Sequence, residues 1–403
     1  MDLLRFLPTR QGVSLAVIII LATATFCWAD ESSSYGHEEG ATQLEPFKPK
    51  AMTGDFKSAL VIDADTGLVL VATNAQVRRQ PASMLKMMTE LIVLEHIADG
   101  DMTMDDVVTV SARSSNMGGS QVYLKHGESF TVEELLSALA IHSANDAAVA
   151  LAEHLAGSVE AFVDLMNMRA QDLGMANSEF HSVHGLPAGY KQSPDLTTAE
   201  DLSILGRELI KHPEALEWSA TKTAPFRDGK FTLYNPNKLV GKFRGLDGLK
   251  TGFTGPAGFC VTATAVQKGK RLISVVMGCT TDKARATETT RLLTYGFNAY
   301  KQVKIIPTAG VVLPEPVAVK GGKVSEVTIK YGESLTVMVP RNREDHLVVE
   351  NRLPEKVEAP LPAGAEVGLA VVLLDGVELG RVTLLLAEEL PKGNWWNRLM
   401  NKK

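Results

Sequence analysis

The sequence predicts an α+β protein with a small all-β domain on its C-terminal side. From Phe56 onward, short runs of β-branched residues mix with segments of helical periodicity, and strands and helices do not alternate regularly. From about Lys304 to Leu386 the pattern changes to Val-rich runs separated by Gly and Pro, with a turn signal at Asp375-Gly376. The chain has 403 residues, of which 45% are hydrophobic, and this length allows two or three domains with their own cores.

The N-terminal segment has the features of a signal peptide. Arg5 and Arg10 precede an apolar run over 13–26, and the small residues up to Ala29 suit a cleavage site. An uncleaved membrane anchor is the alternative, because the run is close to the lower length limit for a membrane span. The next stretch, 30–50, is polar and acidic without apolar periodicity, so we expect a disordered leader there.

We therefore expect five segments in chain order. They are a signal peptide over 1–29, a disordered leader over 30–50, a first folded domain over 51–300, a small β-sandwich domain over 301–388 and an amphipathic tail over 389–403. In the tail, Trp395, Trp396, Leu399 and Met400 share one helical face, and the opposite face is polar and basic. Such a tail can adsorb to a membrane surface, and packing on its own domain is the alternative.

Charge and cysteine content exclude several classes of protein. The formal net charge is −6, so no global positive field attracts nucleic acid. Three Cys without a Cys-x-x-Cys pair cannot supply a disulfide scaffold or a four-Cys zinc site. The sequence also lacks a His-Glu-x-x-His zinc helix and a Gly-x-Ser-x-Gly elbow. We therefore expect neither a metal nor another cofactor.

The first candidate for chemistry is the pair Ser83 and Lys86. Pro81 precedes a nearly all-apolar segment over 84–97, as expected of a buried helix that begins near this proline. The spacing places the two side chains on one face, one turn apart, where a desolvated amine with a lowered pKa can take the hydroxyl proton. Ser-x-x-Lys alone is a weak pattern. It recurs at Ser219-Lys222 without such a helix, and a capping Ser followed by a surface Lys is common.

Ser143 and Asn145 form the second candidate. A capping-box pattern at Thr131 and Glu134 opens a helix, and another helical pattern starts near Asp146, so the two residues should occupy a turn between helices. A hydroxyl there can relay a proton to a leaving nitrogen, and an amide side chain can bind a peptide group. A local helix cap is the alternative interpretation.

Lys250, Thr251 and Gly252 form the third candidate. They end the first of three predicted strands, which cover 246–252, 259–267 and 271–278. A cation and a hydroxyl suit a carboxylate, and Gly252 permits a substrate backbone to approach the strand closely. A solvated strand end is the alternative interpretation.

Taken together and in this order, the three motifs resemble the active site of penicillin-recognising serine enzymes. The segments VRRQPASMLKMMT, HSANDAAVALAEHLAG and DGLKTGFT resemble serine-type D-alanyl-D-alanine carboxypeptidases, the low-molecular-mass penicillin-binding proteins. The resemblance extends from about Lys57 to Ala299, and the β domain with its tail also matches that family's architecture. It implies a penicillin-binding transpeptidase/β-lactamase-like domain, an antiparallel sheet flanked by helices, ahead of the β domain.

The resemblance implies a role for each motif residue. Ser83 is the nucleophile, Lys86 the general base, and Ser143 the proton relay to the leaving amine. Asn145 binds the peptide. Lys250 holds Ser143 and supplies a local positive field.

Five further residues follow from the resemblance. Thr251 contacts the terminal carboxylate beside Gly252, and the backbone N–H of Phe253 joins that of the nucleophile in the oxyanion hole. Some relatives have His at the position of Phe253, and a backbone donor survives that change. Arg285 could meet the substrate carboxylate, and His184 lies in a loop near the site. A surface cation and a packed loop histidine are the alternatives for these two.

Cys260 and Cys279 carry a separate expectation. If Lys268 pairs with Arg271 around a Gly269-Lys270 loop, the two cysteines fall opposite each other and could form a disulfide in an oxidising compartment. A register slip of one residue removes the pairing.

The resemblance implies a cell-wall enzyme that removes the terminal D-alanine from peptidoglycan pentapeptide stems through an acyl-enzyme and is acylated by β-lactam antibiotics. Its implied location is the periplasm, with the tail attached to the outer face of the bacterial inner membrane. The alternatives are a D-alanyl endopeptidase, a non-catalytic cell-wall-binding scaffold and a β-lactamase. The chain has no Glu-x-x-Leu-Asn, which would supply the deacylating carboxylate of a class A β-lactamase.

Overall fold

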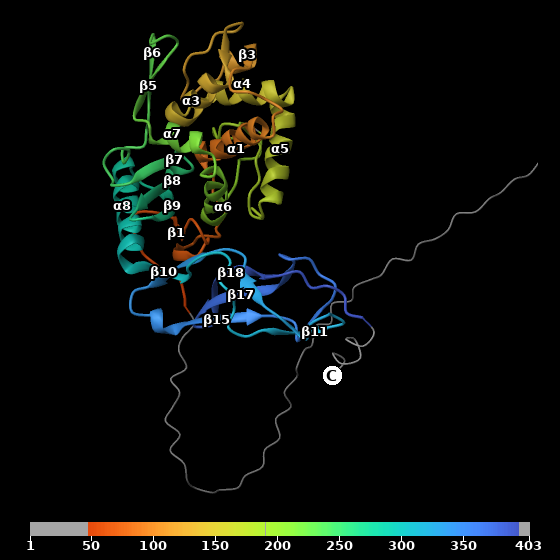
Figure 1. Ribbon diagram of the computed structural model, residues 1–403. Helices are drawn as coiled ribbons and strands as arrows, with labels where there is room; N and C mark the ends of the chain where they lie inside the picture. The colour runs from red at the N-terminus through yellow and green to blue at the C-terminus, as the bar shows by residue number, and fades with distance from the viewer. Residues whose placement is uncertain (1–46, 190, 395–403) are drawn as a thin grey trace, which may run out of the picture. The chain divides into compact units, whose positions relative to one another are not determined.

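The computed structural model describes residues 47–189 and 191–394 (Figure 1). The predicted signal peptide, most of the predicted leader and the tail residues 395–403 lie outside the described residues. None of the helices in the described part combines the length and the apolar character that crossing a bilayer requires.

An antiparallel five-stranded sheet forms the centre of the first domain, with the strand order β2–β1–β9–β8–β7. The strands are β1 (Ser58–Asp63), β2 (Val69–Thr73), β7 (Leu246–Thr254), β8 (Gly258–Gln267) and β9 (Lys270–Cys279). The three strands predicted around the third motif are confirmed as β7, β8 and β9, and no end is displaced by more than two residues.

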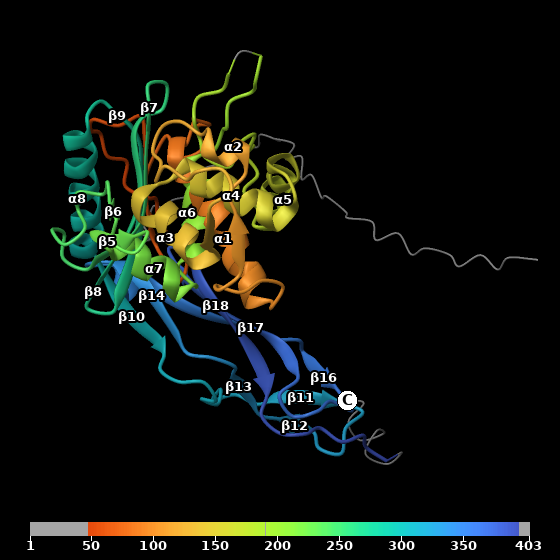
Figure 2. The ribbon, with the colours of Figure 1, turned by 90° about the horizontal axis from the view of Figure 1, so that it is seen from above.

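Helices cover both faces of this sheet, because successive side chains of a strand point to opposite faces. Leu60 and Ile62 of β1 pack in the core of the larger helical group, whereas Ala59 and Val61 pack in the core that contains Leu292 of α8 (Asp282–Ala299). Figure 2 shows α8 on one side of the sheet and the other helices on the opposite side. The predicted α+β class and the sheet flanked by helices are therefore confirmed.

The larger helical group carries two of the three sequence motifs. Its elements are η1 (Ala82–Leu85), α1 (Lys86–Ala98), α2 (Ala112–Ser115), α3 (Val132–His142), α4 (Asn145–Ala156), α5 (Val159–Asp172), α6 (Ala199–Leu209) and α7 (Pro213–Ala220). Two ribbons accompany them, β3 (Val107–Thr109) with β4 (Ser129–Thr131) and β5 (Thr223–Phe226) with β6 (Phe231–Tyr234). Every side chain of α1 from Lys86 to Leu94 is buried, as the apolar segment after Pro81 predicts.

The turn between α3 and α4 is fixed at both sides. At the start of α3, Thr131 Oγ1 accepts from the N–H of Glu134 at 3.2 Å, and the Glu134 carboxylate accepts from the N–H of Thr131 at 2.9 Å, which confirms the capping box. The helix ends at His142, and Ser143 follows with a φ of 66° before α4 begins at Asn145. The left-handed conformation is unfavourable for a residue other than glycine, so the packing around Ser143 must stabilise it.

The C-terminal domain is all-β, as predicted. Its strands are β10 (Tyr300–Ile306), β11 (Val317–Lys320), β12 (Glu326–Val327), β13 (Ile329–Tyr331), β14 (Leu335–Pro340), β15 (Leu347–Arg352), β16 (Lys356–Glu358), β17 (Glu366–Leu374) and β18 (Val377–Leu386), with a short η2 (Glu344–His346). The sheets β13–β18–β17–β15 and β12–β11–β16 share one apolar core. Asp375 and Gly376, with φ of 49° and 79°, form the predicted two-residue turn between β17 and β18.

The folded region extends past two of the predicted boundaries. Phe47 is buried and Lys50 bridges to Val71 of β2, so the folded region already includes residues 47–50, which the sequence predicts to belong to the leader. At the other end, Leu390 is buried and Lys392 still pairs with the β domain, beyond the predicted boundary at 388. Both segments lack apolar periodicity, and each is held by backbone bridges to a segment that is not adjacent in sequence.

The expected pairing of Cys260 with Cys279 is wrong, and both thiols are free. The hairpin turns at Lys268-Gly269 with Gln267 opposite Lys270, so the register differs by two residues from the expected one. Cys260 packs in the core of the larger helical group and Cys279 in the core on the α8 side, so the sheet lies between the two thiols.

We expect both thiols to resist alkylation in the folded protein. Burial raises the pKa of Cys260 to about 11 and that of Cys279 to about 12, so little thiolate forms near neutral pH. Mass spectrometry after iodoacetamide treatment without reductant should find both cysteines unmodified in the native protein and both modified in urea. A peptide pair linked by a Cys260–Cys279 disulfide would contradict the observed register.

Candidate active site

Ser83 and Lys86 meet as their spacing predicts. Ser83 lies in η1 and Lys86 begins α1, and the Lys86 Nζ donates to Ser83 Oγ at 3.0 Å. The same amine donates to the backbone oxygen of His184 at 2.8 Å. Two acceptors therefore fix the amine beside the hydroxyl.

The environment of Lys86 favours a neutral amine. The side chain is fully buried, and this desolvation lowers the pKa of Lys86 well below its usual range. The positive charge of Lys250 lowers that pKa further, while the negative charges of Asp146 and Asp195 raise it. An unprotonated amine in contact with a serine hydroxyl is a competent general base.

Gly252 lets β7 lie directly against η1. A Cβ atom at this position would lie 2.7 Å from the oxygen of Pro81 and 3.1 Å from the nitrogen of Ser83. The sequence predicts that Gly252 admits a substrate backbone, but the chain's own backbone fills that space. Gly252 thus brings the third motif to the first.

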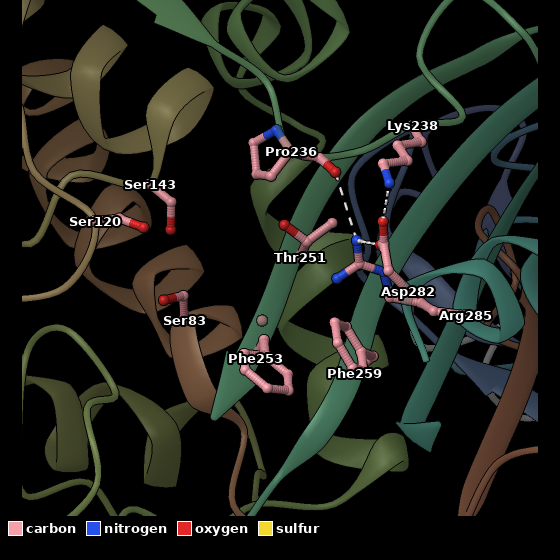
Figure 3. Close-up of a pocket in the computed structure, with 11 residues that line it drawn as sticks. Ser83, Ser120, Ser143, Pro236, Lys238, Thr251, Phe253, Phe259, Asp282 and Arg285 are labelled. Atoms are coloured by element: carbon pink, nitrogen blue, oxygen red, sulfur yellow. Dashed lines mark hydrogen bonds and ion pairs between the residues drawn. The ribbon is translucent and has the colours of Figure 1, made fainter. Parts of the chain in front are cut away.

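A pocket of about 390 Å³ opens between the helical group and the sheet. Figure 3 shows Ser83, Ser120 and Ser143 on one side of it, with Thr251 and Phe253 of β7 facing them. The second motif thus reaches the same pocket as the first and third.

Asn145 is prepared to accept a hydrogen bond. It is buried at the start of α4, and its Nδ2 donates to the oxygen of Gly118 at 2.6 Å. Its buried Oδ1 has no hydrogen-bond partner among the described residues. Asp146 braces the adjacent loop by accepting from the N–H groups of Val122 and Leu124 at 3.0 and 3.1 Å. Asn145 is not among the residues that line the pocket, and its carbonyl oxygen can accept a hydrogen bond from an N–H group.

Lys250 differs from the implied arrangement. Its Nζ donates to the oxygen of Thr251 at 3.2 Å, and in the described part of the chain no hydrogen bond joins it to Ser143. Burial lowers the pKa of Lys250 to about 7, and the charge of Glu90 on α1 opposes this change. Burial also raises the pKa of Glu90 to about 8, and the charge of Lys250 opposes that change.

Phe253 forms the rim of the pocket. Its side chain is 55% exposed and stacks on Phe259 of β8 with ring centroids 4.2 Å apart. An aromatic wall at the entrance offers apolar contact to a ligand, independent of the Phe253 backbone.

Arg285 reaches the pocket from α8, on the far side of the sheet edge from the serines (Figure 3). It is buried, and its guanidinium donates to the oxygens of Cys260 at 3.3 Å and Pro236 at 3.5 Å. It also pairs with the carboxylate of Asp282. Arg285 therefore lines the pocket as a buried residue and is not the surface cation of the alternative interpretation.

His184 acts on the site through its backbone. Its carbonyl oxygen accepts from Lys86, whereas its Nδ1 accepts from the N–H of Leu186 at 3.1 Å. Burial lowers the pKa of His184 to about 4, so the imidazole is neutral. The ring lines a second cavity of about 270 Å³ together with Asp195.

Ser219, in the second Ser-x-x-Lys match, has a structural contact. Its Oγ donates to the oxygen of Asp247 at 2.9 Å and ties the end of α7 to β7. It is buried and does not line the pocket.

Sequence reasoning missed several lining residues, namely Ser120, Pro236, Lys238, Phe259 and Asp282. Ser120 and Lys238 lie in loops without a local pattern, and only packing brings them to the pocket. Asp282 carried a signal, because it lies three residues before Arg285 on a helix. The described residues contain no group of three His, Cys, Asp or Glu side chains that could hold a metal ion.

Comparison with known families covers both domains. Residues 45–281 match the model of peptidase family S11, described as D-alanyl-D-alanine carboxypeptidase. Residues 300–392 match the model described as the C-terminal domain of penicillin-binding protein 5.

Individual relatives align along most of the chain. The D-alanyl-D-alanine carboxypeptidase DacF of Bacillus subtilis is 35% identical over 90% of this chain and 91% of its own length. The structure of penicillin-binding protein 5 from Haemophilus influenzae has a TM-score of 0.76 and 29% identity, covering 86% of this chain and 100% of that one. The ampicillin-bound form of penicillin-binding protein D2 from Listeria monocytogenes has a TM-score of 0.57 and 34% identity, covering 62% of this chain and 100% of that one.

The buried amine beside a serine hydroxyl, the two further motifs at the same pocket and the matches over both domains agree on one assignment: the chain belongs to the D-alanyl-D-alanine carboxypeptidases of peptidase family S11.

Proposed function

We propose that this cell-wall D-alanyl-D-alanine carboxypeptidase acts through an acyl-enzyme on Ser83. The contact of 3.0 Å between the buried Lys86 amine and Ser83 Oγ carries the proposal. Ser83 Oγ attacks the carbonyl carbon between the two D-alanines while its proton passes to the neutral Lys86 amine. The new C–O bond leaves a negative charge on the carbonyl oxygen, which the backbone N–H groups of Ser83 and Phe253 stabilise.

The second half of acylation expels the terminal D-alanine. Collapse of the oxyanion breaks the C–N bond, and Ser143 relays a proton to the leaving nitrogen. The positive charge of Lys250 beside the buried Lys86 keeps that amine ready to give up its proton. Water then attacks the ester carbonyl and releases the shortened stem peptide from Ser83.

Three further residues position the substrate in this scheme. Asn145 Oδ1, which has no hydrogen-bond partner in the described part of the chain, accepts from a peptide N–H. The hydroxyl of Thr251 and the guanidinium of Arg285 bind the terminal carboxylate, since both line the same wall of the pocket. His184 instead positions Lys86, because its backbone oxygen accepts a hydrogen bond from that amine.

β-Lactam antibiotics should acylate the same serine. Their strained amide presents a carbonyl and a nearby carboxylate, the two features that the pocket is proposed to bind. The relative from Listeria monocytogenes, 34% identical, has been crystallised in an ampicillin-bound form, which supports this proposal.

Replacing the nucleophile should abolish both reactions. In Ser83→Ala we expect release of free D-alanine from a muramyl pentapeptide to fall by on the order of 10³ or more, and labelled penicillin should no longer attach. Ser219→Ala is the matched control, because Ser219 belongs to the other Ser-x-x-Lys match and lies outside the pocket. Full labelling of the Ser83→Ala protein would refute the assignment. Penicillin turnover without release of D-alanine by the unaltered protein would favour a β-lactamase.

The rate of penicillin acylation should have a bell-shaped dependence on pH. On the acid side it falls because Lys86 gains a proton, and on the alkaline side it falls because Lys250, with a pKa near 7, loses its charge. Each limb should approach a tenfold loss per pH unit. Lys250→Arg keeps the charge at high pH, so its alkaline limb should move to higher pH, measured by stopped-flow acylation. An alkaline limb unchanged in that variant would assign the limb to another group.

We also propose that the protein is exported to the periplasm and attached to the outer face of the inner membrane by its tail. The charged and Trp-bearing pattern of 395–403 supports an interfacial helix. A chain that ends at Asn394 retains Leu390 and Lys392, which pair with the β domain.

The shortened chain should leave the membrane without losing activity. Fractionation should move it from the membrane pellet to the soluble fraction, while release of D-alanine per acylated enzyme stays the same. The anchor proposal fails if the shortened chain remains in the pellet.

A further inference from the structure

A chain of ion pairs crosses the wall of the pocket. Asp282 pairs through Oδ1 with Arg285 and through Oδ2 with Lys238, and all three residues line the pocket (Figure 3). One carboxylate thus serves two cations, and the three groups together carry one positive charge.

The three side chains differ in solvent exposure and therefore in how freely they can move. The Arg285 side chain is 8% exposed, that of Asp282 is 26% exposed and that of Lys238 is 67% exposed. Arg285 is fixed by packing and by the face of Phe259, 5.9 Å from the guanidinium carbon. Lys238 is a long, solvated side chain that can follow a moving partner. Asp282 lies between them at the start of α8.

Asp282 occupies the donor that a substrate carboxylate would need. The Arg285 contacts with the oxygens of Cys260 and Pro236 are long, at 3.3 and 3.5 Å. Among the described residues Asp282 is the anionic partner of this guanidinium. A second carboxylate at Arg285 would meet the charge of Asp282 at close range, which is unfavourable unless Asp282 moves or is neutralised.

We propose that Asp282 is an internal counter-ion of Arg285, that the carboxylate of the bound substrate displaces it, and that Lys238 then holds Asp282. Binding converts one carboxylate shared by two cations into two separate ion pairs, so the site becomes neutral without an unpaired charge. Asp282 and Lys238 thereby set the affinity of the pocket for a chain end with a free carboxylate. This inference rests on the proposed function, in which Arg285 binds that carboxylate.

The proposed displacement of Asp282 predicts that substitutions of Asp282 and Lys238 change KM in opposite directions. In Asp282→Asn the competing charge is lost while the side chain keeps its size, so KM for a peptide ending in D-Ala-D-Ala should fall about threefold to tenfold at constant kcat. In Lys238→Met the displaced Asp282 has no partner, so KM should rise by a similar factor. In the double variant Lys238→Met should have no further effect, because nothing remains for Lys238 to hold.

The experiment measures KM and kcat for D-alanine release in the full chain, together with melting temperature. The same peptide with its terminal carboxylate amidated serves as the uncharged substrate. Its cleavage releases D-alaninamide, which is measured by mass spectrometry, and its KM should be the same in all variants. Glu288→Gln is the matched control, since Glu288 forms the same i,i+3 pair with Arg291 on α8 but does not line the pocket. Its KM should be that of the unaltered protein.

Two outcomes would overturn the inference. A higher KM in Asp282→Asn would show that Asp282 positions Arg285 for binding. If Lys238→Met raised KM equally in the unaltered protein and in Asp282→Asn, Lys238 would act directly on the substrate. Failure of the proposed function would give different results. KM would be unchanged in Arg285→Gln, or labelled penicillin would still attach to the Ser83→Ala protein.

Discussion

The contact between a fully buried lysine amine and the hydroxyl of Ser83 is the interaction on which the active site depends. A charged ammonium inside α1 would be costly, so burial favours the neutral amine that can accept a proton. The surrounding structure maintains this state. The backbone oxygen of His184 accepts a hydrogen bond from the amine, and the nearby Lys250 repels a second positive charge. The chemistry of the site is thus a consequence of packing around one helix.

That packing also explains why the catalytic groups come from distant parts of the chain. α1 is buried between the sheet and the other helices, so its N-terminal turn ends at the sheet edge formed by β7. Gly252 allows this edge to touch η1, and the left-handed Ser143 turns the α3–α4 connection toward the same space. The opposite wall is closed by α8 with Arg285, so a residue from the helix on the other face of the sheet also lines the pocket.

Much of this arrangement could be predicted from local patterns. The capping box at Thr131 and Glu134, the hairpin turn at Asp375-Gly376 and the strands around Lys250 depend on interactions between residues close in sequence. The hairpin between β8 and β9 could not be predicted in register, because Lys268 adopts a left-handed φ of 52° that its residue type does not indicate. The contact of Lys250 with the Thr251 oxygen, rather than with Ser143, likewise depends on how β7 lies against α1.

The sequence by itself determined the residue types, their spacing and the local structure of each motif. It placed Ser83 and Lys86 one turn apart, because helical geometry relates residues three positions apart whatever surrounds them. Only the tertiary structure decided how buried Lys86 is, that Gly252 receives the backbone of η1, and that Asp282 stands between Arg285 and Lys238. Burial and contacts between distant segments are properties of the packed core, and short-range patterns constrain them too weakly to fix a single geometry.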